Sequence, residues 1–129
     1  MSEQPYFDLS GEASDAPGRF VNVSELDPLE LVPGLEFRPL TTDTVMANFV
    51  SFQPDSTAAM HHHVEQQITI LLSGELTFTV GGETRVMRAG DCVVIPPQVP
   101  HGGVAGAQGC NAVDVFTPPR TGILRFMAS

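Results

Sequence analysis

From Arg19 onward, short apolar or alternating runs are separated by turn-forming residues, a pattern that predicts β-strands. The expected strands are 35–40, 45–52, 58–63, 67–72, 75–80, 84–88, 91–95, 111–116 and 123–126. Turns are expected at 53–55, 73–74, 81–82, 89–90 and 96–97, and the Gly81-Gly82 pair is typical of a hairpin. The one helical turn that the pattern allows is near Val23–Pro28, with Ser24 as its cap.

The first 18 residues differ in composition from the rest of the chain. They are polar, acidic and rich in Gly, Ser and Pro, so residues 1–18 are predicted to be a flexible acidic tail or an arm laid on a partner subunit. Residues 19–129 contain no repeat and no linker. They are therefore expected to form a single all-β domain.

Strand alternation assigns side chains to faces. Gln67 and Thr69 share one face of their strand, and Asp114 and Phe116 share one face of theirs. If Gln67 binds a ligand, its face lines the interior of a barrel. Asp114 lies between two valines, so it either faces solvent or is placed in a cavity.

Composition narrows the function classes. The chain has a formal net charge of −9, and an acidic surface repels phosphate backbones, which argues against nucleic acid as a partner. No apolar run approaches the ~18 residues of a membrane span, so no membrane association is expected. The N-terminus has no basic start followed by an apolar stretch, so we expect a cytoplasmic protein without a disulfide between Cys92 and Cys110.

All four histidines lie in two short segments, HHHVEQQ at 61–67 and PPQVPHGG at 96–103. His61 and His63 are two residues apart and point to the same face of a strand, whereas His62 points to the other and is not counted as a ligand. Together with Gln67 and His101 they could converge on one cation, and imidazole suits Zn, Fe, Ni, Cu and Mn. Four protein ligands would leave positions open for substrate, as in catalytic sites. The alternative is a solvated histidine loop with His101 in a turn.

The spacing His61-x-His63, three residues, Gln67, six residues, Gly74 resembles the first motif of the cupin superfamily. It departs from that motif at Asp55, where Gly is usual, and at Gln67, where Glu is usual.

Residues 90–105 resemble the second cupin motif, with Gly90, Pro96 and His101 at its spacing. Here Gln98 stands where Gly is usual and Ala105 where Asn is usual. The resemblance implies a double-stranded β-helix, the jelly-roll cupin barrel, with a short N-terminal arm. It also implies one divalent transition metal ion (Zn, Ni, Mn or Fe) at the open mouth, held by His61, His63, Gln67 and His101.

The segment VDVFTPPR at 113–120 resembles the closing strand of small cupins that linearise unsaturated uronates from pectin and alginate breakdown. Small cupin polyketide cyclases share much of the same pattern. By this likeness Asp114 is the acid/base, Arg120 clamps a substrate carboxylate or enolate, and Phe116 and Thr69 line the pocket. The alternatives are that Asp114 caps a loop, Arg120 pairs with a surface Glu, and Phe116 is plain core.

The expected function is that of a metal-dependent cupin enzyme acting non-oxidatively on a small oxygenated substrate, by sugar-acid ring opening or isomerisation or by polyketide-type cyclisation. An amide ligand at Gln67 leaves the metal charge less quenched than a carboxylate would, which favours Lewis-acid over redox chemistry. The alternatives are a metal-dependent cupin dioxygenase and a non-catalytic ligand-binding cupin. We expect a homodimer that covers its sheet edges, with Arg19–Val23 as a swapped edge strand.

Overall fold

The structure, a computed structural model, describes residues 5–127. Its strands are β1 (Leu29–Val32), β2 (Leu35–Thr41), β3 (Met46–Phe52), β4 (Thr57–His61), β5 (Gln66–Val80), β6 (Glu83–Met87), β7 (Cys92–Ile95) and β8 (His101–Thr117). The helices are two 3-10 turns, η1 (Pro5–Phe7) and η2 (Val23–Glu25), and the short α1 (Thr121–Leu124).

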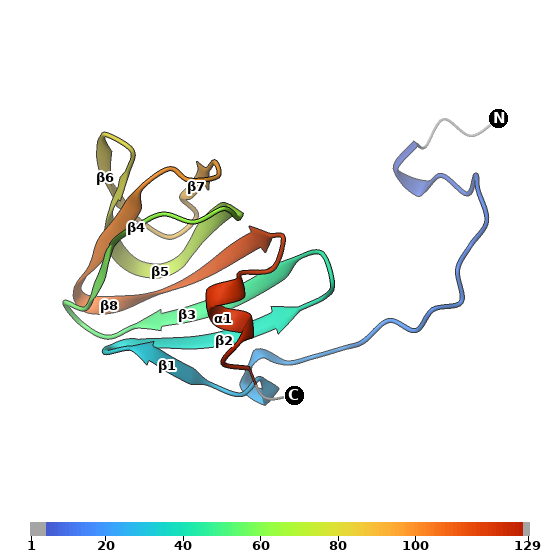
Figure 1. The fold of residues 1–129 in the computed structure, drawn as a ribbon, viewed down its shortest axis with the longest axis horizontal. Coiled ribbons are helices and arrows are strands. Elements are labelled where there is room, and N and C mark those ends of the chain that lie inside the picture. Colours follow the sequence, from blue (N-terminus) through green and yellow to red (C-terminus); the bar gives the residue numbers. More distant parts are fainter. Residues whose placement is uncertain (1–4, 128–129) are drawn as a thin grey trace.

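Two long strands hold the barrel together. All pairings are antiparallel, in the order β1-β2-β3-β8-β5-β6, with β4 added to β8 and β7 added to β5. The C-terminal half of β8 pairs with β3 and its N-terminal half with β4, while β5 runs beside β8 along its whole length. This shared use of β5 and β8 folds the sheet over on itself into a jelly roll (Figure 1), which confirms the predicted fold class.

The predicted turn at Ser73-Gly74 is wrong, because β5 continues through it with a bulge. The register with β8 shifts between Leu71 and Ser73 and again between Gly74 and Leu76. Gly74 has a φ of +78°, and a Cβ there would lie 2.2 Å from a backbone oxygen of β8. A glycine is therefore required at position 74 by the bulge and by the close approach of β8. In the sequence alone, a glycine required for these reasons cannot be distinguished from one in a turn.

The second half of the chain differs from the sequence prediction at two further places. β8 begins at His101 instead of 111, and the adjacent Gly102 and Gly103 are needed for close packing there. A Cβ on Gly102 would lie 2.8 Å from the Ala58 oxygen, and one on Gly103 would lie 2.6 Å from the Phe78 ring. The predicted strand 123–126 is wrong, because α1 occupies its start and buries Ile123 against Met46 and Phe116.

The N-terminal region forms one capped turn and an extended arm. The helical turn expected at 23–28 is η2, and its cap is Asn22 instead of Ser24. The Asn22 side chain accepts from the Ser24 N–H at 3.0 Å, and the Asn22 N–H donates to Glu25 at 2.7 Å. Residues 6–20 are exposed and extend away from the barrel (Figure 1), and 19–23 forms no strand within the chain. Swapped pairing of this segment and flexibility of residues 1–18 remain predictions.

The core lies between the two halves of the folded sheet. Its main cluster consists of Leu71, Leu76, Phe78, Met87, Ile95, Ala105, Cys110 and Ala112, and a smaller one joins Met46, Phe116 and Ile123 beneath α1. Both cysteines are free thiols, Cys92 exposed and Cys110 buried. Within residues 5–127 no helix is long and apolar enough to cross a membrane.

Candidate metal centre

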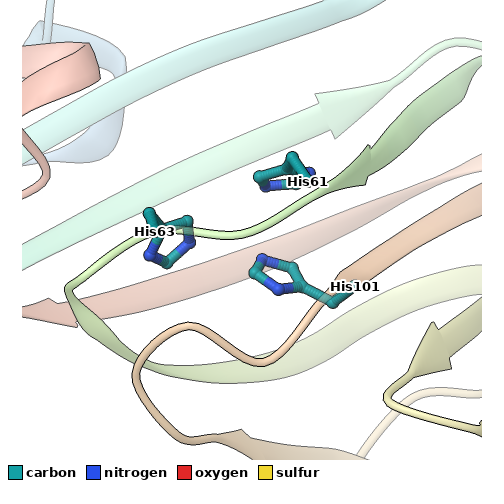
Figure 2. A group of neighbouring side chains, drawn as sticks. All are labelled: His61, His63 and His101. Carbon is teal, nitrogen blue, oxygen red and sulfur yellow. The ribbon is translucent and has the colours of Figure 1, made fainter.

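Three histidine rings converge at the open end of the barrel (Figure 2). His61 ends β4, His63 lies in the loop before β5, and His101 begins β8 directly opposite His61 in the β4–β8 register. The centroid of the His101 ring lies 4.3 Å from that of His61 and 4.9 Å from that of His63. One potential ligand nitrogen from each ring lies within 4.8 Å of the other two. The sheet register thus joins the two histidine segments of the sequence.

Each of the three rings is oriented by a backbone carbonyl. The accepting oxygens belong to Ala59, Glu65 and Val99, at 2.7, 3.0 and 2.9 Å from Nδ1 of His61, His63 and His101 respectively. A carbonyl oxygen only accepts, so Nδ1 of His61 and of His101 carries the proton and donates it, whereas His63 also has the Gln67 amide oxygen 3.0 Å from its Nε2. Nε2 of His61 and of His101 is therefore left with a lone pair, which is the form of imidazole that binds metal ions.

His101 has a buried ring nitrogen that a cation would fit. Its side chain is 1% exposed, and its Nε2 has no hydrogen-bond partner among the described residues. Burial lowers the pKa of His101 to about 4 and also lowers the pKa of His63, to which the charge of Arg120 contributes. Both rings are neutral near pH 7, so the buried lone pair of His101 suits a metal ion, which would relieve the cost of leaving it unpaired.

Gln67 is aligned with the histidines by a chain of hydrogen bonds. Its amide N–H donates to the Thr69 hydroxyl at 2.8 Å, and that hydroxyl donates to Asp114 at 2.7 Å. The remaining amide oxygen of Gln67 therefore points toward Nε2 of His63, 3.0 Å away. The Gln67 amide oxygen and the Glu65 carbonyl oxygen are both acceptors, and a neutral His63 ring has one N–H for the two of them, so a cation bound at Nε2 would satisfy the second contact.

A cavity of about 410 Å³ opens beside the histidines. It is lined by seven of the eight predicted site residues, namely His61, Gln67, Thr69, His101, Asp114, Phe116 and Arg120. The eighth, His63, is buried behind them and packs edge-on against the Phe116 ring. His62 lies outside the cavity and contacts Gln98 at 2.9 Å, in agreement with its exclusion from the predicted ligands.

Asp114 and Phe116 both face the cavity from β8. Asp114 is half-buried, and burial raises the pKa of its carboxyl to about 6, although the hydrogen bond from Thr69 lowers it. The alternative of a solvent-facing Asp114 is therefore wrong. Phe116 serves in two ways, since it lines the cavity and also packs into the core with Ile123.

Glu65 is a buried carboxylate that the sequence analysis did not single out. Its side chain is 1% exposed and lies 3.3 Å from Nδ1 of His63 and 3.8 Å from the Arg120 guanidinium. Its other oxygen accepts from the Thr121 N–H at 3.1 Å. Burial alone would raise the pKa of Glu65, but the Thr121 N–H and the charge of Arg120 outweigh it and lower the pKa. Strand alternation does not place Glu65, because it lies in the loop between β4 and β5 and is held there by its contacts with Thr121 and Arg120.

Asn48 is the second polar residue of the cavity that the sequence analysis missed. It lies on β3 between the buried Met46 and Val50, and its side chain is 1% exposed. A polar residue at an inward position of an apolar strand was the available signal.

Comparison with known proteins identifies a family and two relatives of this chain. Residues 48–116, more than half of the chain, match the family model described as "Cupin domain". A stretch of 97 residues is 28% identical to the pectin degradation protein KdgF of Dickeya dadantii (strain 3937), covering 74% of this chain and 88% of that protein. Another, of 50 residues, is 48% identical to the H2HPP isomerase of Bacillus subtilis but spans 38% of this chain and 21% of that protein.

Two solved structures are similar over most of the barrel. KdgF from Halomonas sp. has a TM-score of 0.77 and 28% identity, with 83% of this chain and 99% of that chain covered. An RmlC-like cupin from Shewanella frigidimarina NCIMB 400 has a TM-score of 0.77 and 27% identity, with coverages of 83% and 96%. These likenesses agree with the resemblance read from the motifs.

Proposed function

The chain belongs to the cupin domain family, and we propose that it is a metal-dependent enzyme that isomerises or opens the ring of a small sugar acid without oxidation. The observation that carries this proposal is the convergence of three imidazole rings, each with one potential ligand nitrogen within 4.8 Å of the other two, beside a cavity that Asp114 and Arg120 also line. The two KdgF relatives, one of them a pectin degradation protein, support a sugar acid over a polyketide.

His61, His63, Gln67 and His101 would hold one divalent transition metal ion, Zn, Ni, Mn or Fe. When bound, such an ion polarises a carbonyl or hydroxyl oxygen of the substrate. All four ligands are neutral, so they do not reduce the charge of the ion. His61 is the exposed member of the set and faces the cavity, which supports a coordination position open to substrate.

Asp114 is suited to move a proton. With a pKa of about 6 it is mostly ionised at pH 7, and it can accept a proton from a substrate hydroxyl and return it to a carbon atom. The hydrogen bond from Thr69 holds the carboxylate in place. Moving one proton from oxygen to carbon changes neither composition nor oxidation state overall, so the reaction needs no oxidant.

Arg120 is suited to bind the substrate carboxylate. Its guanidinium lines the cavity, and the ion pair with Glu65 at 3.8 Å keeps it at the wall instead of in solvent. A planar guanidinium has further N–H donors for a second carboxylate. Phe116 provides the apolar wall between this position and His63.

The test combines metal analysis with a substrate assay. We expect about one transition metal ion per chain in untagged protein, lost in His101→Ala, and loss of the ring-alkene absorbance of 4,5-unsaturated galacturonate in the presence of the wild type. Asp114→Asn should keep its metal but lose at least about 100-fold in rate. Wild-type protein that neither contains nor takes up metal would overturn the proposal. Metal-loaded protein that consumes oxygen would instead support the dioxygenase alternative.

A further inference from the structure

Asn48 carries an unpaired polar group in the wall of the cavity. Its side chain is 1% exposed, and its Oδ1 has no hydrogen-bond partner among residues 5–127. Nearly all buried polar atoms in folded proteins are paired, because an unpaired one loses its hydration without compensation. An amide retained in this position therefore needs a partner that is not part of the fold.

The sheet register places Asn48 beside the proposed proton-transfer group. Asn48 is directly opposite Asp114 on β8, and Asp114 is directly opposite Thr69 on β5. The Thr69 hydroxyl donates a hydrogen bond to the Asp114 carboxylate at 2.7 Å, whereas Asn48 takes no part in that bond. All three residues line the same cavity.

The inward neighbours of Asn48 on β3 and β8 offer it no polar partner. The inward neighbours along β3 are Met46 and Val50, and those along β8 are Phe116 and Ala112, all apolar and buried. The open side of Asn48 is the cavity itself, next to Asp114.

We propose that Asn48 is a specificity-determining residue whose Oδ1 accepts a hydrogen bond from a substrate hydroxyl held beside Asp114. This inference rests on the proposed function only in taking the cavity as the substrate site. It deepens that function by requiring a hydroxylated substrate, because an analogue without the hydroxyl would leave Oδ1 unpaired on binding. A sugar acid meets the requirement, with its carboxylate toward Arg120 and a ring hydroxyl toward Asn48.

The first readout needs no substrate. Asn48→Leu keeps the size of the side chain and removes the unpaired amide, so metal-loaded Asn48→Leu should unfold at the wild-type temperature or above it. The matched control is Asn111→Leu, because Asn111 makes hydrogen bonds with Ser51 and Ser73 at 2.5 and 2.9 Å. That variant should unfold at a lower temperature and keep wild-type kinetics. A larger fall in unfolding temperature for Asn48→Leu than for Asn111→Leu would assign Asn48 a structural role and overturn the proposal.

The second readout is binding and turnover of sugar acids. Calorimetric titration with galacturonate should show about tenfold weaker binding to Asn48→Leu than to wild type, the size expected for one hydrogen bond. With 4,5-unsaturated galacturonate, KM should rise by a similar factor while kcat and metal content stay near wild type. Equal binding by both proteins would overturn the role of Asn48 and leave the proposed function intact. Galacturonate binding that depends on Asn48, without turnover of the unsaturated sugar, would overturn the proposed function and support Asn48. Binding of neither sugar acid to wild type would overturn the hydroxylated substrate class.

Discussion

Replacing Glu65 by Gln should weaken both the metal site and the fold, since Glu65 connects His63 to the C-terminal segment. The carboxylate lies 3.3 Å from His63 and 3.8 Å from Arg120, and it accepts a hydrogen bond from the Thr121 N–H at 3.1 Å. Gln keeps the size and an acceptor oxygen for Thr121. It loses the negative charge that faces two donors in a site that is 1% exposed.

The magnitude follows from these contacts. Removing one partner of a buried ion pair costs about 3–5 kcal/mol. Because Gln can retain the hydrogen bond to Thr121, we expect a loss of about 2 kcal/mol in the free energy of unfolding, and Glu65→Ala should approach the full value. Losing a carboxylate that orients a metal-binding histidine lowers metal affinity by about 10–100-fold. That factor corresponds to about 1.4–2.7 kcal/mol of binding free energy.

Two assays separate these effects. Urea unfolding of chelator-treated protein measures the fold, and competition with a zinc-binding dye measures the metal affinity. Glu83→Gln is the matched control, because Glu83 forms an exposed ion pair with Arg85 that is worth about 0–1 kcal/mol at most. If Glu65→Gln binds zinc within twofold of wild type, Glu65 does not orient His63. If it unfolds at the same urea concentration as Glu83→Gln, the buried charge of Glu65 does not stabilise the fold.

Three further predictions concern the bulge, the thiols and the pH dependence. Gly74→Ala should destabilise the protein by at least about 2 kcal/mol in urea unfolding, because its φ is +78° and the new Cβ would lie 2.2 Å from the Gly109 oxygen. The control Gly82→Ala, whose new Cβ would have nothing within 4 Å, should change the free energy of unfolding by no more than about 0.5 kcal/mol. Equal effects of the two substitutions would refute the constraint at the bulge. Burial raises the pKa of Cys110 to about 11, whereas Cys92 is exposed, so a thiol reagent at pH 8 should label only Cys92 in the native protein. Labelling of native Cys92→Ala would show that the Cys110 thiol is not buried. The pKa of Asp114 is raised from 3.8 to about 6 in the fold, so the folded state binds more protons between these values and its stability falls as pH rises through them. In metal-free protein, the free energy of unfolding of Asp114→Asn, measured in urea, should therefore exceed that of wild type by up to about 3 kcal/mol at pH 7 and by little at pH 4. A difference that does not depend on pH would refute the raised pKa.

The sequence by itself determined the features that depend on local geometry. The two-residue period of a strand placed Gln67 with Thr69 on one face of their strand and Asp114 with Phe116 on one face of theirs, and the structure has all four at the cavity. The His-x-His spacing, joined to His101 by motif resemblance, identified the histidines that converge. The inference for the four strand residues holds because strand alternation is a property of the backbone and needs no knowledge of distant residues. His63 lies in the loop after β4, so the prediction that it shares a strand face with His61 is wrong, and the motif resemblance identified it instead.

The tertiary structure decided what depends on contacts between distant segments. Whether Gly74 makes a turn or a bulge depends on the Gly109 oxygen, and the helical form of 121–124 depends on burying Ile123 against Met46. Glu65 is buried as an ion because Arg120 and Thr121, more than fifty positions away, compensate its charge. Asn48 is recognisable as unpaired only when every neighbour across three strands is known. Charge compensation and hydrogen-bond satisfaction are sums over spatial neighbours, and chain order alone does not reveal those neighbours.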